Sequence, residues 1–198
     1  YDTNKLALLI TQTGGGCRAS NYIFLLRKAL KKAGYGHIPV ISLNFAGLEK
    51  GSAFKVTAPL AIRLLYAAIL GDLIMLLRNQ CLPYELNAGD TERVCDKWVA
   101  RLTHDMAKNG KLKYAAVKQF YKDILADFAA IPRSSEKKVR VGIVGEIFVK
   151  FSPLGNNELE KFLLSENAEV VMPGLLDFCM FSCHNSVTDA QLLGMKKG

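Results

Sequence analysis

The sequence predicts an α/β fold in which a parallel sheet of about four strands carries a helical insertion. Short apolar runs of strand length are followed by glycine or polar residues, and a helical pattern separates the first two runs. Three long helical patterns then follow with no strand pattern between them. Half of the 198 residues are apolar, which supports a globular core and excludes disorder as a description of the whole chain.

The start of the chain predicts a strand, a helix and a second strand. Residues 6–11 form a continuous apolar run, which is typical of a strand buried on both faces. The helix that follows can be capped by Ser20 or Asn21, and Gly34 stands where a left-handed residue would end it. Residues 38–45 form the second apolar run. A strand, helix and strand within about 40 residues indicate a right-handed crossover with parallel strands.

The rest of the chain predicts three helices and two more strands. Val94, Trp98, Leu102 and Met106 form one stripe of the second helix, and Pro132 stops the third. The helices are expected at residues 57–80, 90–109 and 111–130. Two buried strands are expected at residues 139–144 and 169–172, separated by a helix over 158–165 that Asn156 or Asn157 can cap.

These elements together predict one Rossmann-like or flavodoxin-like domain over residues 1–198. It would consist of a first βαβ unit (1–56), the helical insertion (57–132) and a second βαβ unit (133–198). Because both ends of the chain stand beside predicted elements, we expect it to be a fragment of a longer protein.

The net charge of +8 is concentrated near the start of the chain, since residues 1–60 hold eight basic and two acidic side chains. Such a charge favours an anionic partner, although Lys28, Lys31 and Lys32 can equally form the solvated face of the first helix. No arginine-rich arm or nucleic-acid-binding module is present, so no nucleic-acid partner is expected.

The cysteines and the apolar segments indicate a cytoplasmic protein. Five cysteines form no even, short-spaced framework and no secretory signal is recognisable, so a reducing compartment is expected. Residues 58–77 are apolar, but Pro59, Arg63, Gly71 and Asp72 interrupt them. A charge at mid-bilayer is costly, so this segment is expected to be a buried helix and no membrane association is expected.

The turn after the first strand holds three consecutive glycines, Gly14, Gly15 and Gly16, followed by Cys17 and Arg18. One residue with positive φ suffices for such a turn, so three glycines indicate that a ligand comes close to the backbone. Successive amides at a helix start bind anions and, with Arg18, would lower the pKa of Cys17. The alternative is that Cys17 is a small core residue beside a tight turn.

The same turn matches a dinucleotide-binding pattern only weakly. Gly14, Gly16 and Ala19 fit G-x-G-x-x-A, but two residues separate the strand from the first glycine. Asn44 stands where an acidic ribose ligand would be expected, and a phosphate loop of the G-x-x-x-x-G-K-[ST] type is absent.

The remaining chemically active side chains give weaker signals. Cys179, Cys183 and His184 have metal-ligand character, but their apolar neighbours favour core packing. Cys81 and Cys95 are assigned structural roles. Glu146 follows a predicted strand and is either a site carboxylate, a helix cap or the partner of a lysine. His37 and His104 are expected at the surface or at a helix end.

Ligands of open parallel sheets bind beyond the carboxyl ends of the strands. Those ends should converge on one crevice. They are residues 12–17, Asn44, residues 145–146 and residues 173–174.

Several of these segments together resemble a known family. The segments are TQTGGGCRASNY (11–22), HIPVIS (37–42), VGEIFVK (144–150), GNN (155–157) and VMPGLLD (171–177). They resemble the 2-hydroxyacyl-CoA dehydratase and benzoyl-CoA reductase superfamily, specifically a domain of the long acyl-CoA dehydratase activase-related proteins. The resemblance spans nearly the whole chain.

The resemblance implies a Rossmann-like domain in which cysteines hold an iron–sulfur cluster. In that family an ATP-hydrolysing activator injects one electron that drives radical chemistry on an acyl-CoA. Cys17 matches a ligand position of a [4Fe–4S] cluster, and the further ligands would come from outside the fragment or from another subunit. Cofactor-binding roles are then expected for the residues around it and for the end of the third strand. These are Gly14, Gly15, Gly16, Arg18, Ser20 and Glu146.

Two alternatives of other classes remain open. The glycine turn can serve as an anion cradle for a nucleotide or CoA phosphate without catalysis. The apolar segment 58–77 can instead be an assembly element that docks on the rest of its own chain or on a homologous subunit. If instead Cys17 is one ligand of a cluster shared with segments outside the fragment, the isolated fragment is expected to be folded but inactive.

Overall fold

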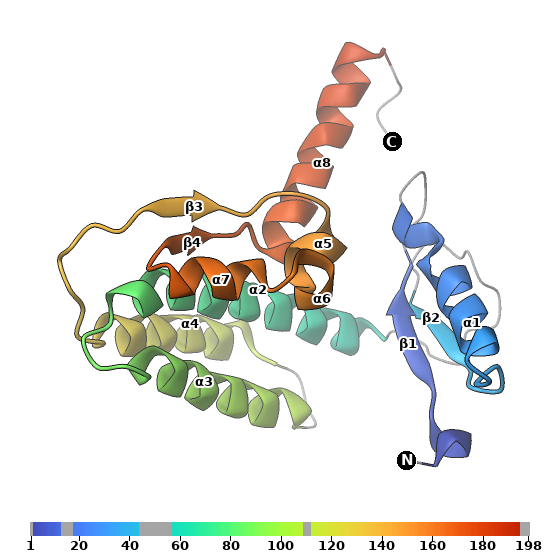
Figure 1. Cartoon of the computed structure of the whole chain (residues 1–198), viewed down its shortest axis with the longest axis horizontal. Helices are drawn as coiled ribbons and strands as arrows, with labels where there is room; N and C mark the ends of the chain where they lie inside the picture. Colours follow the sequence, from blue (N-terminus) through green and yellow to red (C-terminus); the bar gives the residue numbers. More distant parts are fainter. Residues whose placement is uncertain (1, 13–17, 44–56, 109–111, 195–198) are drawn as a thin grey trace. The chain divides into compact units, whose positions relative to one another are not determined.

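The computed structural model describes residues 2–12, 18–43, 57–108 and 112–194. The chain divides into two compact units, Tyr1–Thr57 and Ala58–Gly198 (Figure 1). The division falls next to the predicted end of the first βαβ unit at residue 56. Each unit has its own parallel pair of strands, and each is described by itself below.

The first unit contains the predicted strand, helix and strand (Figure 1). Strands β1 and β2 pair in parallel with Leu8 opposite Val40 and Thr11 opposite Leu43. The helix between them ends as predicted, with Gly34 at φ +83° directly after the C-cap residue Ala33. The elements of this unit are the 3-10 helix η1 (Thr3–Lys5), β1 (Leu8–Thr11), the 3-10 helix η2 (Arg18–Ser20), α1 (Tyr22–Lys32) and β2 (Val40–Leu43).

Burial of the first strand differs from the prediction. Side chains of β1 alternate between half-buried and exposed, and Leu9 is 53% exposed, so β1 is not buried on both faces. Helix α1 packs against β2 and buries Ile23 completely, together with Val40. A two-stranded sheet covered by one helix has one open face, which explains the alternation.

The second unit is built around three long helices. These form one core with Trp98 and Leu70 fully buried at its centre. The stripe predicted on α3 is confirmed, because Val94 is buried and Leu102 and Met106 pack against the same core. The helices are α2 (Ala58–Cys81), α3 (Asp90–Ala107) and α4 (Tyr114–Ala129), with the 3-10 helix η3 (Leu82–Tyr84) after α2.

The second strand pair lies in the same unit as these helices. The helices predicted as an insertion (57–132) therefore form the larger part of the second unit. Strands β3 and β4 are parallel, with Arg140 opposite Glu169 and Gly142 opposite Val171. Val170 is buried here, and Met75 of α2 packs against its cluster. The remaining elements are β3 (Arg140–Gly142), α5 (Ile147–Phe151), α6 (Pro153–Asn156), α7 (Leu159–Ser165), β4 (Glu169–Val171) and α8 (Leu175–Leu192).

The fold is therefore mixed α/β, with two parallel pairs of strands in place of one four-stranded sheet among the described residues. The third strand is also shorter and more open than predicted: Val139 and Val144 are 73% and 81% exposed and lie outside β3. Alternating valines favour a strand, but the ladder of β3 is limited to three residues because its partner β4 is itself three residues long.

Helix α2 is only half buried, which corrects the prediction of a buried helix over residues 58–77. Leu70, Leu73 and Ile74 are buried, whereas Ile62, Leu64 and Leu65 in its first half are each about half exposed. By length and composition alone, Ala58–Tyr84 could cross a membrane.

The polar side chains of α2 are engaged with other parts of the second unit. The Arg63 guanidinium donates to the carbonyls of Met106 and Lys108 at the end of α3. Asp72 accepts hydrogen bonds from the start of α8, and Arg78 pairs with Glu92. These contacts favour a helix that belongs to a protein core.

Candidate functional site

The glycine turn itself lies outside the described residues, which include neither Gly14, Gly15 and Gly16 nor Cys17 and Asn44. The expectations for these five residues therefore stay predictions. Both flanks of the turn are described, however, and they show how the chain is fixed on either side of it.

Gln12 links three segments at the carboxyl end of β1. Its backbone N–H donates to the Leu43 carbonyl of β2 at 3.0 Å, and its side-chain Oε1 accepts from the Ser42 hydroxyl at 2.8 Å. Its Nε2 donates to the Ser20 carbonyl at 2.9 Å. Because Gln12 and Ser42 are both buried, this network holds the residues before and after the turn at the end of the strand pair.

The sequence prediction placed Gln12 in the strand end 12–17 but assigned no hydrogen bond to it or to Ser42. A signal was present, because Gln12 directly follows the first apolar run and Ser42 is a polar residue within the second. Polar side chains at the ends of adjacent parallel strands lie at one edge of the sheet, where they can bond each other.

Arg18 and Ser20 form the 3-10 turn that leads into α1. Arg18 is exposed, and among the described residues no carboxylate lies within ion-pair distance of it. The N-cap of α1 is Asn21, but its side chain does not form the capping hydrogen bond that was allowed for in the prediction. The Gln12 side chain instead fixes the backbone just before this N-cap, through the Ser20 carbonyl.

Glu146 caps helix α5. Its carboxylate accepts from the backbone N–H of Val149 at 3.2 Å, and the first helical residue is Ile147. This geometry fits the capping alternative left open for Glu146. Its role as a site carboxylate stays a prediction.

The carboxyl ends of β3 and β4 meet in the second unit, as parallel pairing requires. Lys150 of α5 donates through Nζ to the Pro173 carbonyl at 2.8 Å, which ties the segment after β3 to the segment after β4. Asp72 of α2 accepts from the backbone N–H groups of Leu175 and Leu176 at 3.0 and 2.7 Å. A Cβ at Gly174 would lie 2.5 Å from the Asp72 carboxylate, so only glycine allows this approach.

The carboxyl ends of the two strand pairs are thus fixed differently. The end of β1 is held by the neutral amide of Gln12, whereas the ends of β3 and β4 are held by Lys150 and Asp72. The expectation that all four ends converge on one crevice stays a prediction.

Cys81 and Cys95 are buried in the helical core, which fits the structural roles assigned to them. Burial raises the pKa of both thiols, and that of Cys95 reaches about 11 with Glu92 adding to the effect. Both are therefore neutral near pH 7 and poor candidates for nucleophiles or ligands.

Cys179 and Cys183 are both exposed on α8, which corrects the prediction that they pack in a core. Their apolar neighbours Phe178, Met180 and Phe181 are exposed as well. The prediction failed because it inferred burial from composition, and α8 has apolar residues all round and buries none of its described side chains. The two cysteines stand four residues apart, so both thiols lie on one face of the helix.

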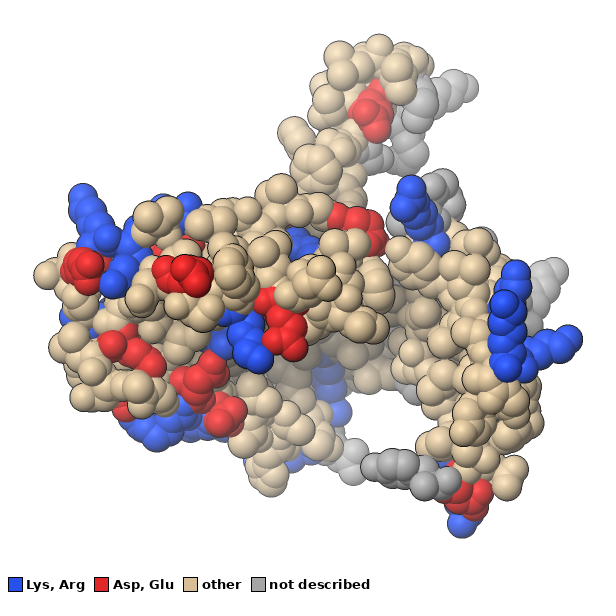
Figure 2. All heavy atoms as spheres, viewed as in Figure 1, with Lys and Arg blue, Asp and Glu red and all other residues tan. Residues whose placement is uncertain are grey.

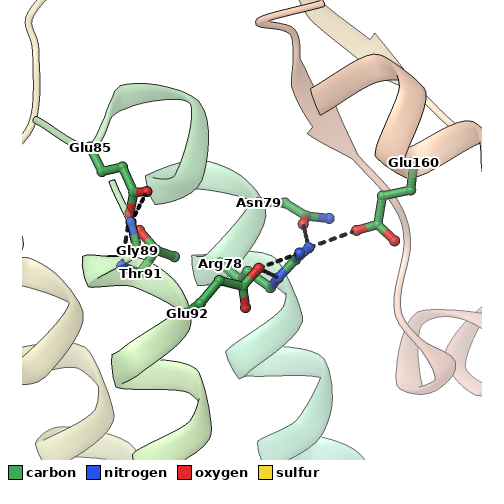
Figure 3. A network of polar contacts seen from close by, with 7 residues as sticks. All are labelled: Arg78, Asn79, Glu85, Gly89, Thr91, Glu92 and Glu160. Carbon is green, nitrogen blue, oxygen red and sulfur yellow. Dashed lines mark hydrogen bonds and ion pairs between the residues drawn. The ribbon is translucent and has the colours of Figure 1, made fainter. Parts of the chain in front are cut away.

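A polar network on α2 joins three helices and is structural (Figure 3). The Arg78 guanidinium donates to Glu92 of α3 at 2.6 Å and to Glu160 of α7 at 3.2 Å. It also donates to the side chain of the buried Asn79 at 3.2 Å. Each carboxylate of this network is engaged by the same cation, so it presents no free base or acid for catalysis.

Among the described residues, no three His, Cys, Asp or Glu side chains gather closely enough to hold a metal ion. Comparison of the chain with protein-family models, curated proteins and solved structures found no match.

Proposed function

We propose that this chain is a domain of an iron–sulfur redox component related to the 2-hydroxyacyl-CoA dehydratases or their activators. It would take part in ATP-dependent single-electron transfer to an acyl-CoA. A bound [4Fe–4S] cluster supplies one-electron chemistry. Cys17 is proposed as one ligand, and the amides of Gly15 and Gly16 with the Arg18 side chain stabilise negative charge beside it.

The described residues alone do not complete such a site. A four-iron cluster normally uses at least three thiolates, and no three candidate ligand side chains gather among the described residues. The observation that carries the proposal is the exposed thiol pair, Cys179 and Cys183, one turn apart on α8. Among the described cysteines, these two thiols are exposed, whereas Cys81 and Cys95 are buried in the core. In the same proposal the two parallel strand pairs are parts of one Rossmann-like sheet in the complete protein.

Anaerobic reconstitution with iron and sulfide tests the proposal. The iron and sulfide content and the visible absorption spectrum are measured for the unaltered chain, for Cys17→Ala and for the double variant Cys179→Ala/Cys183→Ala. Both variants should lose most of the bound iron. Cys81→Ala is the matched control and should keep it, because its thiol is buried. If Cys17→Ala keeps the iron, the sulfide and the spectrum, the ligand role is wrong.

The second candidate is binding of a nucleotide or CoA phosphate at the glycine turn without catalysis. Arg18 favours it, because this arginine is the first described residue after the turn, is exposed and pairs with no described carboxylate. Calorimetry with CoA, an acyl-CoA and NAD tests it, and Arg18→Gln should weaken any binding seen. No heat with any of the three at millimolar concentration would count against this candidate.

We propose that the partner of the chain is the rest of its own protein or a homologous subunit. We also propose that the protein is cytoplasmic. Exposed apolar side chains on α8 and on the first half of α2 favour this proposal. Figure 2 shows α8 as mostly uncharged, while acidic and basic groups are interspersed over the other helices of the second unit. Sedimentation of the isolated chain tests it, and a strictly monomeric species up to high concentration would argue against it.

A further inference from the structure

A cavity of about 270 Å³ lies in the second unit, where α5, α6 and α7 meet. It belongs to the same region as the carboxyl ends of β3 and β4, since α5 directly follows β3 and Lys150 reaches the end of β4. Its walls combine two cations, two carboxylates, an amide and two apolar rings. The lining residues are Lys150, Phe151, Pro153, Asn156, Glu158, Glu160 and Lys161.

Lys150 is the unusual member of this lining, because it is only 7% exposed. Its ammonium group donates one hydrogen bond, to the Pro173 carbonyl at 2.8 Å, and lies 4.8 Å from the centre of the Phe151 ring. No carboxylate in the described part of the chain forms an ion pair with it. An ammonium has three N–H donors, so two remain for a ligand, and a buried cation without a counter-charge is costly.

The other three charges of the cavity already form ion pairs within the protein. Glu158 pairs with Lys161 at 2.9 Å, and Glu160 shares Arg78 with Glu92, accepting from it at 3.2 Å in the network drawn in Figure 3. These pairs leave Lys150 as the one cation of the described lining without an ion pair. A monoanion can therefore pair with Lys150, whereas a dianion is disfavoured because Glu158 and Glu160 remain close by.

The rim of the cavity is fixed in advance of any ligand. The Asn156 side chain donates to the carbonyls of Val149 and Lys150 and holds the end of α5 in place. Asn157 and Glu158 both adopt left-handed backbone conformations, each at φ +55°. Two such non-glycine residues in succession are uncommon and need surrounding contacts to hold them.

We propose that this cavity binds a short-chain monocarboxylic acid, with Lys150 as the counter-charge of its carboxylate. The hydrocarbon part would lie against Phe151 and Pro153. The free N–H donors and the positive charge of Lys150 match a carboxylate, whereas a phosphate dianion would bring a second charge towards Glu158 and Glu160. This site is separate from the glycine turn and does not depend on the proposed cluster.

Titration of the whole chain with sodium butyrate tests the proposal, with butyramide as the uncharged probe of the same shape. Calorimetry gives the affinity, and amide chemical shifts of the ¹⁵N-labelled chain locate the site. Butyrate should bind and shift the amides of residues 150–161. Butyramide should bind at least about tenfold more weakly, because it offers no charge to Lys150. This comparison needs no variant and so is unaffected if a substitution disturbs folding.

Two matched variants then compare Lys150 with a lysine outside the cavity. Lys150→Met keeps the length of the side chain and should weaken butyrate binding at least about tenfold. Lys118→Met removes an exposed cation of α4 that does not line the cavity and should change the affinity by less than about twofold. Iron content of the reconstituted chain should be the same in both, which separates this site from the cluster proposal.

Three results would overturn the proposal. Equal binding of butyrate and butyramide would exclude a charge-directed site. Inorganic phosphate binding as tightly as butyrate would exclude a site for monocarboxylates. Shifts confined to amides near Arg18 would place the bound anion at the glycine turn instead.

Discussion

Helices α3 and α8 have the same length, 18 residues, but opposite relations between composition and burial. Helix α3 is the more polar of the two, yet it buries four residues, among them Val94 and Trp98. Helix α8 holds only two charged residues, Asp177 and Asp189, and buries no described side chain (Figures 1 and 2). Apolar content alone therefore does not determine which helix enters the core.

The difference lies in how the apolar residues are spaced. On α3 they recur at three and four residues and form one stripe, which α2 and α4 cover. On α8 they occur all round the helix, and in the described part of the chain its first turn is hydrogen-bonded to Asp72 of α2. A helix that is apolar on every side needs cover on every side. This requirement supports our proposal that α8 contacts another part of the complete protein.

The largest expected difference between the two helices is in stability. Trp98 is fully buried and donates from Nε1 to Asp127 at 2.7 Å, so Trp98→Ala should lower the free energy of unfolding by about 3–5 kcal/mol. Phe181 is 60% exposed, so Phe181→Ala should change the free energy of unfolding by less than about 0.5 kcal/mol. Urea denaturation of the isolated chain measures both. Equal losses in the two variants would show that α8 is packed in solution.

Thiol reactivity should separate the two helices next. Cys95 of α3 has a pKa of about 11, so roughly one thiol in a thousand is ionised at pH 8, and burial also excludes the reagent. Cys179 and Cys183 of α8 are exposed. Alkylation by iodoacetamide, followed by peptide mass spectrometry, should be at least about a hundredfold faster on α8. Comparable alkylation rates at Cys95 and Cys183 would contradict the burial of Cys95 in the helical core. The unfolded chain in urea is the control, because all thiols should then react.

The sequence predicts the elements of this protein better than their assembly. The stripe of α3 and the left-handed Gly34 after α1 were both predictable, because period and backbone conformation are local properties. The pairing of β1 with β2 was predictable from the crossover rule. The exposure of Val144 and Cys179 was not, because burial depends on which distant segment covers a side chain.

The candidate site shows the same limit. Glu146 and Arg18 were recognisable as polar residues at the ends of predicted elements. Lys150 belongs to the segment VGEIFVK, but nothing in the sequence shows that its ammonium is buried beside Pro173. The role of Asp72 was likewise hidden, because its partners at the start of α8 lie about 100 residues away in the chain.

The anchoring of α8 gives a smaller effect. Asp72→Ala removes the acceptor for the N–H groups of Leu175 and Leu176 and should cost about 1–2 kcal/mol of unfolding free energy. Asp72→Asn keeps one acceptor oxygen and should cost less. Asp189→Ala, at an exposed position near the other end of α8, is the control and should change stability by less than about 0.5 kcal/mol. Hydrogen exchange at the first turn of α8 should accelerate in Asp72→Ala only, and unchanged exchange would show that this helix start does not depend on Asp72.

The smallest expected effect concerns pH at the start of α3. Partial burial opposes ionisation of Glu85, but hydrogen bonds from Thr91 and from the backbone N–H of Gly89 outweigh it and lower the pKa of this carboxyl (Figure 3). A lowered pKa in the folded state stabilises the protein above the unfolded value of about 4.3, and this contribution is lost as the pH falls through the folded value. The urea midpoint should therefore decrease on acidification below about pH 4.3.

The variant Glu85→Gln shows how much of the decrease in the urea midpoint on acidification is due to Glu85. The variant should be less stable than the unaltered chain at pH 7, because the amide accepts the N–H of Gly89 and Thr91 less well than a carboxylate does. The difference should vanish once Glu85 is protonated in the unaltered chain. Glu166→Gln, at an exposed position after α7, should leave the profile unchanged. If the urea midpoint of Glu85→Gln ran parallel to that of the unaltered chain at every pH, the start of α3 would be fixed by its buried stripe and not by the Glu85 hydrogen bonds.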